Sequence, residues 1–237
     1  MREKHELATR FDNGDAVTHL CREAHNLKGT GAAFGFPVVT LIAHRPEDYL
    51  AETSALEPRQ VEDAQRFVDA LSAVLEEGVN PDRAARERLL RSPPAKWSPG
   101  APAAQFADFE VLLVTPSKVT GAVVERLLQK RGFRVVASHS AASAIFLAVA
   151  SRPDLVIVSS VQQPVSGVDI ARAFAAMRVT RDLPFALPTS HAPDHRSLDE
   201  LPDCAAVLRA GARFEDDLDA ALRRFDLIEA SCRPHSP

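Results

Sequence analysis

Apolar side chains in roughly the first ninety residues recur three and four positions apart, which is the repeat of helices that bury one face. Two such stripes stand out, and both are expected to face a core: the first contains Val17, Leu20, Cys21, Ala24 and Leu27, and the second contains Val61, Ala64, Phe67, Val68, Leu71, Val74 and Leu75. Between them, Pro37 predicts the first position of a helix that runs to Leu50. The segment Asn80-Pro81-Asp82 then predicts the start of a short charged helix that ends near Leu90.

The pattern changes in the second half of the chain, where short apolar runs alternate with helical segments. Five runs are expected to be strands, at residues 111–114, 134–137, 155–158, 185–187 and 206–208. Helices are expected between them, and a last helix is expected from about Phe214. Continuous apolar strands that alternate with helices predict a parallel sheet covered on both faces.

A segment rich in proline and alanine separates the two patterns. Proline cannot donate a backbone hydrogen bond, so this stretch is predicted to be a semi-extended linker. The expected organisation is an all-α helical bundle at residues 1–90, a linker at 91–107, an α/β doubly wound five-stranded parallel sheet at 108–230, and a tail at 231–237.

Composition narrows the classes of partner and compartment. The 237 residues carry a formal net charge of -4, and no stripe of basic residues with interleaved aromatics is present, which argues against nucleic acid. No apolar run approaches the roughly 18 residues of a membrane span, and the polar start lacks the apolar core of a signal peptide. The three cysteines, Cys21, Cys204 and Cys232, have no metal-ligand spacing. A reducing cytoplasm is therefore the expected location.

Candidate chemistry lies in the segment Ala24 to Phe36. On a helix, His25, Lys28 and Gly29 share one face and present an imidazole, an ammonium group and bare backbone to the same partner. The segment resembles the phosphoacceptor stretch of histidine phosphotransfer (HPt) domains, whose pattern is matched by His25, Leu27, Lys28, Gly29 and Gly35. The resemblance implies that His25 is the phosphoacceptor, that Lys28 offsets charge on the phosphoryl oxygens, and that Gly29 leaves the approach clear.

A finer resemblance, to the phosphorylated domain of chemotaxis-type histidine kinases, extends without a gap from His25 to Glu47. It implies that Glu47 bonds Nδ1 of His25 and leaves the lone pair on Nε2, and that His44 belongs to the same site. The alternatives are that Glu47 is an exposed carboxylate without a role and that His44 is structural. Pro46 predicts a kink or a restart of the helix, either of which would displace Glu47.

The amino end departs from this family, because only Met1 to about Arg10 is available for the helix that usually precedes the histidine helix. The bundle is therefore expected to be incomplete within one chain. Dimerisation, packing against the second domain, or a start further upstream would complete it, and the sequence does not choose among these.

Residues 109–228 resemble the receiver domain of response regulators, but the chemistry of that family is replaced. The phosphoacceptor aspartate position is Ser160, the two acidic metal-binding positions are Thr115 and Pro116, and the lysine position aligns with Ala210-Gly211. Thr189 alone fits the hydroxyl position of the family. The resemblance implies a pseudo-receiver that binds no metal and is not phosphorylated. An unrelated flavodoxin-like domain is the alternative.

Together these observations predict a phosphorelay protein that accepts and donates a phosphoryl group at His25, needs no cofactor, and lacks a kinase catalytic domain. Its expected partners are a histidine kinase catalytic domain, phosphorylated receiver domains, or both, and a homodimer remains open. The pseudo-receiver would serve docking, dimerisation or regulation. A catalytically silent scaffold, and a sink that drains phosphoryl groups from a receiver, are the alternatives.

Overall fold

The computed structural model describes residues 13–50, 53, 56–91, 109–192 and 194–228. The chain divides into two compact units, residues 1–99 and 100–237. The predicted linker from residue 92 onward lies outside the described residues, as do Trp97, the predicted tail with Cys232, and the segment before α2. Within the described residues, no helix combines the length and the apolar character that crossing a membrane requires.

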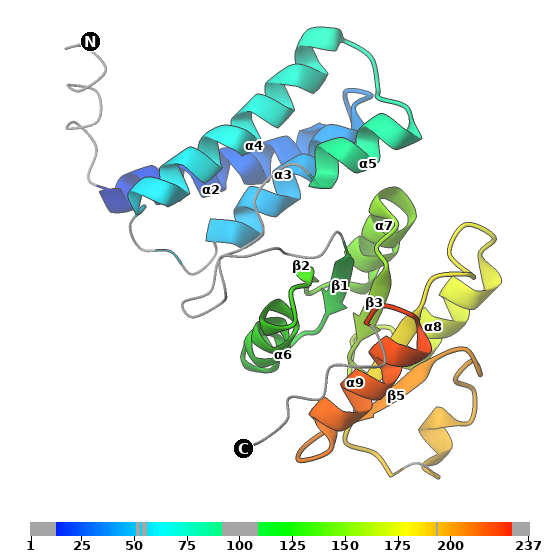
Figure 1. Cartoon of the computed structure of the whole chain (residues 1–237). Coiled ribbons are helices and arrows are strands. Elements are labelled where there is room, and N and C mark those ends of the chain that lie inside the picture. The colour runs from blue at the N-terminus through cyan, green and yellow to red at the C-terminus, as the bar shows by residue number, and fades with distance from the viewer. Residues whose placement is uncertain (1–12, 51–52, 54–55, 92–108, 193, 229–237) are drawn as a thin grey trace. The chain divides into compact units, whose positions relative to one another are not determined.

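The first unit consists, in its described part, of the helices α2 (Asn13–Thr30), α3 (Pro37–Leu50), α4 (Pro58–Glu77) and α5 (Arg83–Arg91) (Figure 1). Helix α3 packs against each of the other three. It begins at the proline and ends at the leucine that the sequence predicts. Its apolar residues from Val38 to Ala43 are buried, as expected of a helix with neighbours on several sides.

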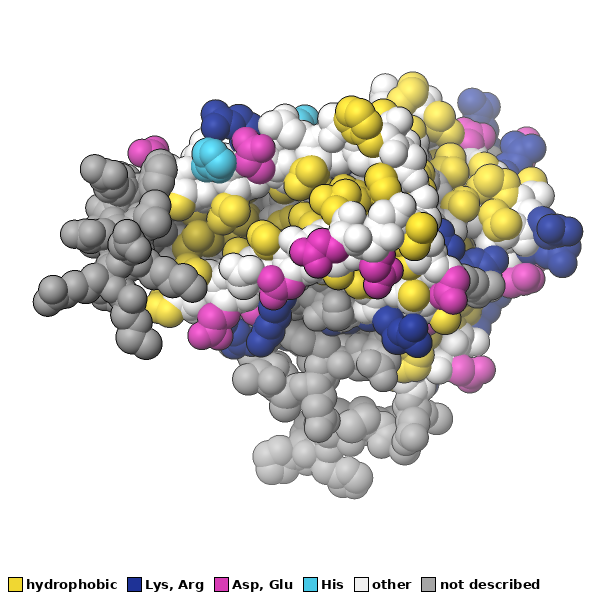
Figure 2. Space-filling model, turned by 90° about the horizontal axis from the view of Figure 1, so that it is seen from above, with side chains coloured by type: hydrophobic (Ala, Val, Ile, Leu, Met, Phe, Trp, Pro, Cys, Tyr) yellow, Lys and Arg dark blue, Asp and Glu magenta, His cyan; other side chains and the backbone are white. Residues whose placement is uncertain are grey.

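Helix α4 buries only part of its predicted apolar stripe. Its buried positions include Phe67, Leu71 and Val74. Val61, Val68 and Leu75 are between 44% and 53% exposed, so the prediction that the whole stripe faces a core is wrong for these three. They lie on one flank of the buried arc, because they are spaced seven residues apart and a helix that packs on one neighbour covers only part of its circumference. Seen from above, hydrophobic side chains run across this face, with acidic side chains along one side of them (Figure 2).

The second unit is a five-stranded parallel sheet. Its strands are β1 (Glu110–Val114), β2 (Arg134–Ser138), β3 (Leu155–Val158), β4 (Phe185–Thr189) and β5 (Ala206–Arg209), in the spatial order β2-β1-β3-β4-β5. This is the order of a flavodoxin-like doubly wound sheet. All five predicted strands form. The helices are α6 (Lys118–Lys130), α7 (Ala141–Ser151), α8 (Gly167–Ala176) and α9 (Phe214–Arg224).

One connection differs from the prediction of a helix between every pair of strands. The described residues between β4 and β5 form a short 3-10 helix, η1 (Arg196–Leu198), and no α-helix. The segment contains Pro193 and Pro202, and proline removes the backbone donor that an α-helix needs. The expectation of a complete alternation is therefore wrong at this crossover.

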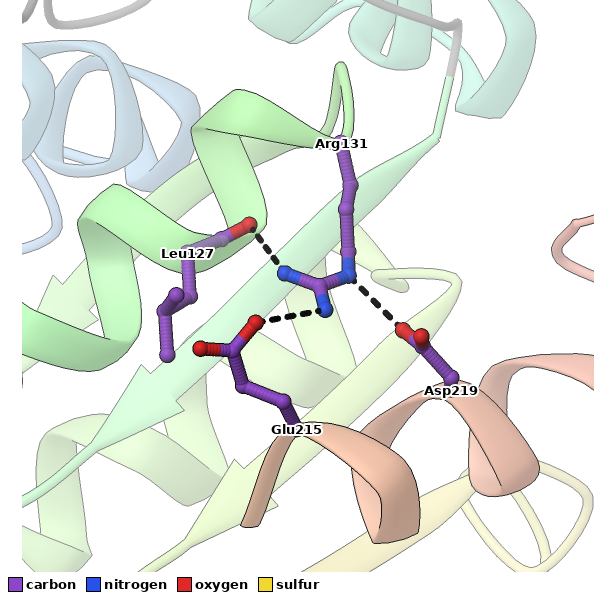
Figure 3. A network of polar contacts seen from close by, with 4 residues as sticks. All are labelled: Leu127, Arg131, Glu215 and Asp219. Carbon is purple, nitrogen blue, oxygen red and sulfur yellow. Dashed lines mark hydrogen bonds and ion pairs between the residues drawn. The ribbon is translucent and has the colours of Figure 1, made fainter. Parts of the chain in front are cut away.

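Helices α6 and α9 share one core with the sheet and are joined by a polar network at its rim. The shared core includes Leu113 and Ile157 of the sheet, Leu128 of α6 and Leu222 of α9. Arg131, directly after α6, donates from Nε to Asp219 Oδ1 over 2.8 Å and from Nη2 to Glu215 Oε2 over 3.2 Å, both on α9. Its Nη1 also donates to the Leu127 carbonyl over 3.0 Å (Figure 3). One guanidinium thus fixes the two helices to each other.

A second ion pair makes the stability of this unit depend on pH. Arg209 of β5 donates from Nε to Asp217 Oδ2 over 2.7 Å and from its backbone N–H to the same oxygen over 2.9 Å. The hydrogen bond from the Arg209 side chain is the main cause that lowers the pKa of Asp217 to about 2, from the ordinary value of 3.8. A carboxyl group with a lowered pKa stabilises the fold above its unfolded-state pKa, and that contribution disappears as the pH falls toward 2.

Asp217→Asn is therefore expected to lower the unfolding temperature of this unit at pH 7, with the deficit relative to the wild type shrinking between about pH 4 and pH 2. Thermal unfolding followed by circular dichroism at a series of pH values measures this. Asp216→Asn, at an exposed position on the same helix, is the control. A deficit that stays constant down to pH 2 would show that the ion pair is not its source.

Candidate functional site

Gly31, directly after α2, lies close to Thr40 of α3, and this close approach brings the site residues of the two helices together. A Cβ atom at Gly31 would lie 2.9 Å from both N and Oγ1 of Thr40, so a side chain there would force the backbone of α3 to shift. The neighbouring N–H of Ala32 donates to Thr40 Oγ1 over 3.1 Å. Gly35 then adopts a φ of +85°, the left-handed region that favours glycine. The packing role of Gly31 was not predicted, because only a three-dimensional neighbour distinguishes it from Gly29.

The structure brings three of the predicted site residues together across this contact. His25 Nδ1 lies 3.0 Å from Glu47 Oε1, although the two residues are 22 positions apart. Lys28 Nζ donates to the other carboxylate oxygen, Oε2 of Glu47. The His25 side chain is 67% exposed. With Nδ1 held by the carboxylate, the second ring nitrogen, Nε2, is the one free of this contact.

The charge of the Glu47 carboxylate is supported by its neighbours. Partial burial alone would raise the pKa of Glu47, but the hydrogen bonds from Lys28 and His25 and the positive charge of Lys28 outweigh it and hold this pKa below its ordinary value. The carboxylate is therefore ionised at neutral pH. An ionised acceptor opposite Nδ1 favours the tautomer that carries its proton on Nδ1 and its lone pair on Nε2.

Gly29 and His44 complete the predicted set. Gly29 is exposed on α2, and a Cβ atom placed there would meet nothing within 4 Å, so the space beside it is open. Its lack of a side chain serves no packing within the described residues. His44 is partly buried on α3, three residues before Glu47, and thus shares a face with it.

Pro46 does not interrupt α3. The helix runs from Pro37 to Leu50 as one element with Pro46 inside it, so the prediction of a restart is wrong. Glu47, the next residue, still reaches His25. The proline lacks the N–H that would bond to the Ile42 carbonyl, and the turn that follows it is tied to neighbouring helices by side chains instead.

In the second unit, the positions named from the receiver resemblance lie at the carboxyl ends of the strands. Thr115 follows β1 and is buried, and Ser160 follows β3. Thr189 ends β4, and its Oγ1 accepts from the His191 N–H over 3.1 Å. The β4–β5 register places Arg209, rather than Ala210, opposite Thr189. Among the described residues, no group of three or more His, Cys, Asp or Glu side chains is placed to hold a metal ion.

Comparisons with known proteins gave different families of matches for the two units. The family model of the Hpt domain matches residues 2–77. A search of curated proteins gave no match. The chain thus joins an Hpt-type helical region to an α/β domain with the receiver-type strand order.

Solved structures similar to this chain include receiver domains. One is the receiver domain of a sensor histidine kinase from Pseudomonas aeruginosa, with 20% identity, a TM-score of 0.45, and coverage of 50% of this chain and 98% of that one. Another is a chemotaxis response regulator of Vibrio cholerae, with 19% identity, a TM-score of 0.44, and coverage of 49% and 98%. A sensor protein from Polaromonas shows 22% identity, a TM-score of 0.44, and coverage of 50% and 97%.

Proposed function

We propose, for a chain that joins an Hpt-type region to a receiver-like domain, that His25 accepts a phosphoryl group from one protein of a two-component system and donates it to another. The match of residues 2–77 to the Hpt family supports histidine phosphotransfer as the activity. The contact of Glu47 with Nδ1 of an exposed histidine supports His25 as the residue that performs it. This contact is the observation on which the proposal rests.

In the proposed step, the lone pair on Nε2 of His25 attacks the phosphorus of the donor. A nitrogen–phosphorus bond forms while the bond from phosphorus to the donor atom breaks, and the electron pair of that bond leaves with the donor. The ring keeps its proton on Nδ1 and gains positive charge. Glu47, 3.0 Å from Nδ1, stabilises that charge without taking the proton away. Transfer to an acceptor reverses these events.

Lys28 has two proposed roles in this step. Its bond to Glu47 holds the carboxylate beside Nδ1 before transfer. Its ammonium group also lies one turn along α2 from His25, where it offsets the charge of the phosphoryl oxygens once they arrive. The open space beside Gly29 admits the partner that brings them. His44, on the same face of α3 as Glu47, is proposed to belong to the same site.

The receiver-like unit is proposed to act without a phosphoryl group of its own. Ser160 stands where the receiver family has its aspartate, and Thr115 and Pro116 stand where it has metal-binding acids. A hydroxyl without a neighbouring base is a poor nucleophile, and these residues offer no carboxylate to a hard cation. Docking, dimerisation or regulation is the role proposed for it. Neither an Hpt domain nor a receiver domain is a kinase catalytic domain, so the donor is proposed to be another protein.

Phosphoramidate, a chemical donor, and a panel of phosphorylated receiver domains from the same organism test the proposal. Incubation with either is expected to label the chain with phosphate that is stable to alkali and labile to acid, as phosphohistidine is. Mass spectrometry is expected to locate the label on His25. A chain that binds the receivers and takes no label from any donor would instead be a scaffold, and label on another residue would refute the assignment of the site.

A further inference from the structure

Helix α3 is fixed to α4 by a buried polar contact just beyond Glu47. Tyr49 and Asp63 are 4% and 3% exposed, and the Tyr49 hydroxyl donates to Asp63 Oδ2 over 2.6 Å. Arg66 donates to the other carboxylate oxygen over 3.2 Å. A buried carboxylate costs free energy unless its oxygens are bonded, so this arrangement fixes the relative rotation of the two helices. Neither Tyr49 nor Asp63 belongs to the pattern that identifies the histidine segment.

The contact lies in the final turn of α3, which follows Pro46. Pro46 removes one backbone hydrogen bond of α3, and the helix ends four residues later at Leu50. The final turn carries Glu47 on one side and Tyr49 on another, and it is joined to the preceding turn by one backbone hydrogen bond fewer than in an uninterrupted helix. Side-chain contacts with α2 and α4 must hold the turn in place.

Apolar packing joins the same turn to the histidine helix. Tyr49 and Leu50 form a buried cluster with Phe67 of α4, and the Tyr49 and Phe67 rings are 5.7 Å apart between centroids. Leu20 and Cys21 of α2, about one turn before His25, pack against this cluster. A shift of Tyr49 would thus move the end of α3 relative to the helix that carries His25.

We propose that Tyr49 and Asp63 are positioning residues of the phosphotransfer site: their hydrogen bond fixes the turn after Pro46 and so keeps Glu47 on Nδ1 of His25. The inference rests on the proposed function for its effect on phosphoryl transfer. Its structural part, the placement of Glu47, is independent of that function. A displacement of about 1 Å in a catalytic arrangement can cost up to 100-fold in rate, so a single distant hydroxyl has a measurable effect.

Tyr49→Phe is the direct test, because it keeps the ring and removes only the hydroxyl. Ring ¹⁵N chemical shifts report the tautomer of His25, and a His25→Gln spectrum assigns its signals among the eight histidines. The wild type is expected to hold its neutral ring mainly as the Nδ1–H tautomer. The variant is expected to lose that preference and to accept phosphate from phosphoramidate about tenfold more slowly, at a temperature where it remains folded.

Two further variants separate positioning from simple loss of stability. Asp63→Asn retains one oxygen that can accept from Tyr49 and loses the one that accepts from Arg66, whose exposed side chain can bond to water instead. It is therefore expected to stay near the wild type in both measurements, whereas Asp63→Ala is expected to behave like Tyr49→Phe. This pair also decides the matter if Tyr49→Phe does not fold. Leu90→Ala removes a buried side chain of α5 that is not part of the cluster around Tyr49, and it serves as a control for lost stability.

The outcomes distinguish the two proposals. If the wild type takes no phosphate but the tautomer responds to Tyr49→Phe and Asp63→Ala, the proposed function fails and the positioning role stands. If the wild type is phosphorylated, and Tyr49→Phe and Asp63→Ala keep its tautomer and rate, the positioning role is refuted. It is also refuted if Leu90→Ala changes the tautomer as much as Tyr49→Phe does.

Discussion

Replacement of His25 by glutamine is expected to abolish phosphoryl acceptance by this chain. Glutamine occupies a similar volume and is tolerated at an exposed helical position, but its amide nitrogen has no lone pair available for attack on phosphorus. The second unit is proposed to offer no substitute, because Ser160 stands where the resemblance places the receiver aspartate. Acid-labile label from phosphoramidate or from a phosphorylated receiver is expected to fall to background, at least about 1,000-fold below the wild type, as for the loss of a catalytic nucleophile.

His19→Gln is the matched control, since His19 is also exposed on α2 and lies outside the predicted site. It is expected to take up label at the wild-type rate. Circular dichroism should show equal helix content for both variants. Label that persists in His25→Gln would mean that another residue accepts the phosphoryl group, and His44 would be the first to examine.

The secondary structure could be read from the sequence where a single physical cause dominates. The strands are continuous apolar runs because a parallel sheet is covered on both faces, and all five were predictable for that reason. Helix α3 was predictable at both ends, because Pro37 is suited to a first helical position and apolar residues follow it. The prediction of an α-helix between β4 and β5 was wrong, because it extended the alternation of strands and helices to a segment that contains prolines.

Burial was harder to predict than the elements themselves. Val61 and Val68 have the same spacing and chemistry as Phe67 and Val74, yet the former two are exposed and the latter two buried. The difference depends on which neighbours surround α4, and hydrophobic spacing reports only that a residue could be covered. The same limit applies to Gly31, whose close contact with Thr40 is a property of two helices.

For the site, the sequence could place His25 and Lys28 on one face, because they are three positions apart on one helix. It could not show that Lys28 bonds Glu47, since that contact joins two helices. Besides the expected role of Lys28 beside the phosphoryl oxygens, the structure shows that Lys28 bonds the carboxylate of Glu47, which contacts His25. Pro46 was the main reason to doubt that Glu47 reaches His25. Rules for the backbone alone do not take into account the side-chain contacts that hold the turn after Pro46.

Glu47→Gln is expected to slow phosphoryl acceptance about 100-fold, comparable to the loss of one preorganised electrostatic contact in an active site. The pKa of Glu47 lies below its ordinary value, so the wild-type residue carries its charge at the pH of the assay. The neutral amide stabilises the positive ring less. It also has one acceptor oxygen where the carboxylate uses two, so it can accept from His25 or from Lys28 but not present an oxygen to both.

Rapid-quench measurement of the transfer rate from a phosphorylated receiver, at saturating receiver, separates this loss from weaker docking. Glu76→Gln, on the exposed side of α4, controls for a change in net charge and is expected to leave the rate unchanged. A Glu47→Gln chain that remains folded and transfers at the wild-type rate would mean that its contact with Nδ1 contributes nothing to catalysis. Exposure and the chemistry of the imidazole alone would then have to account for the reactivity of His25.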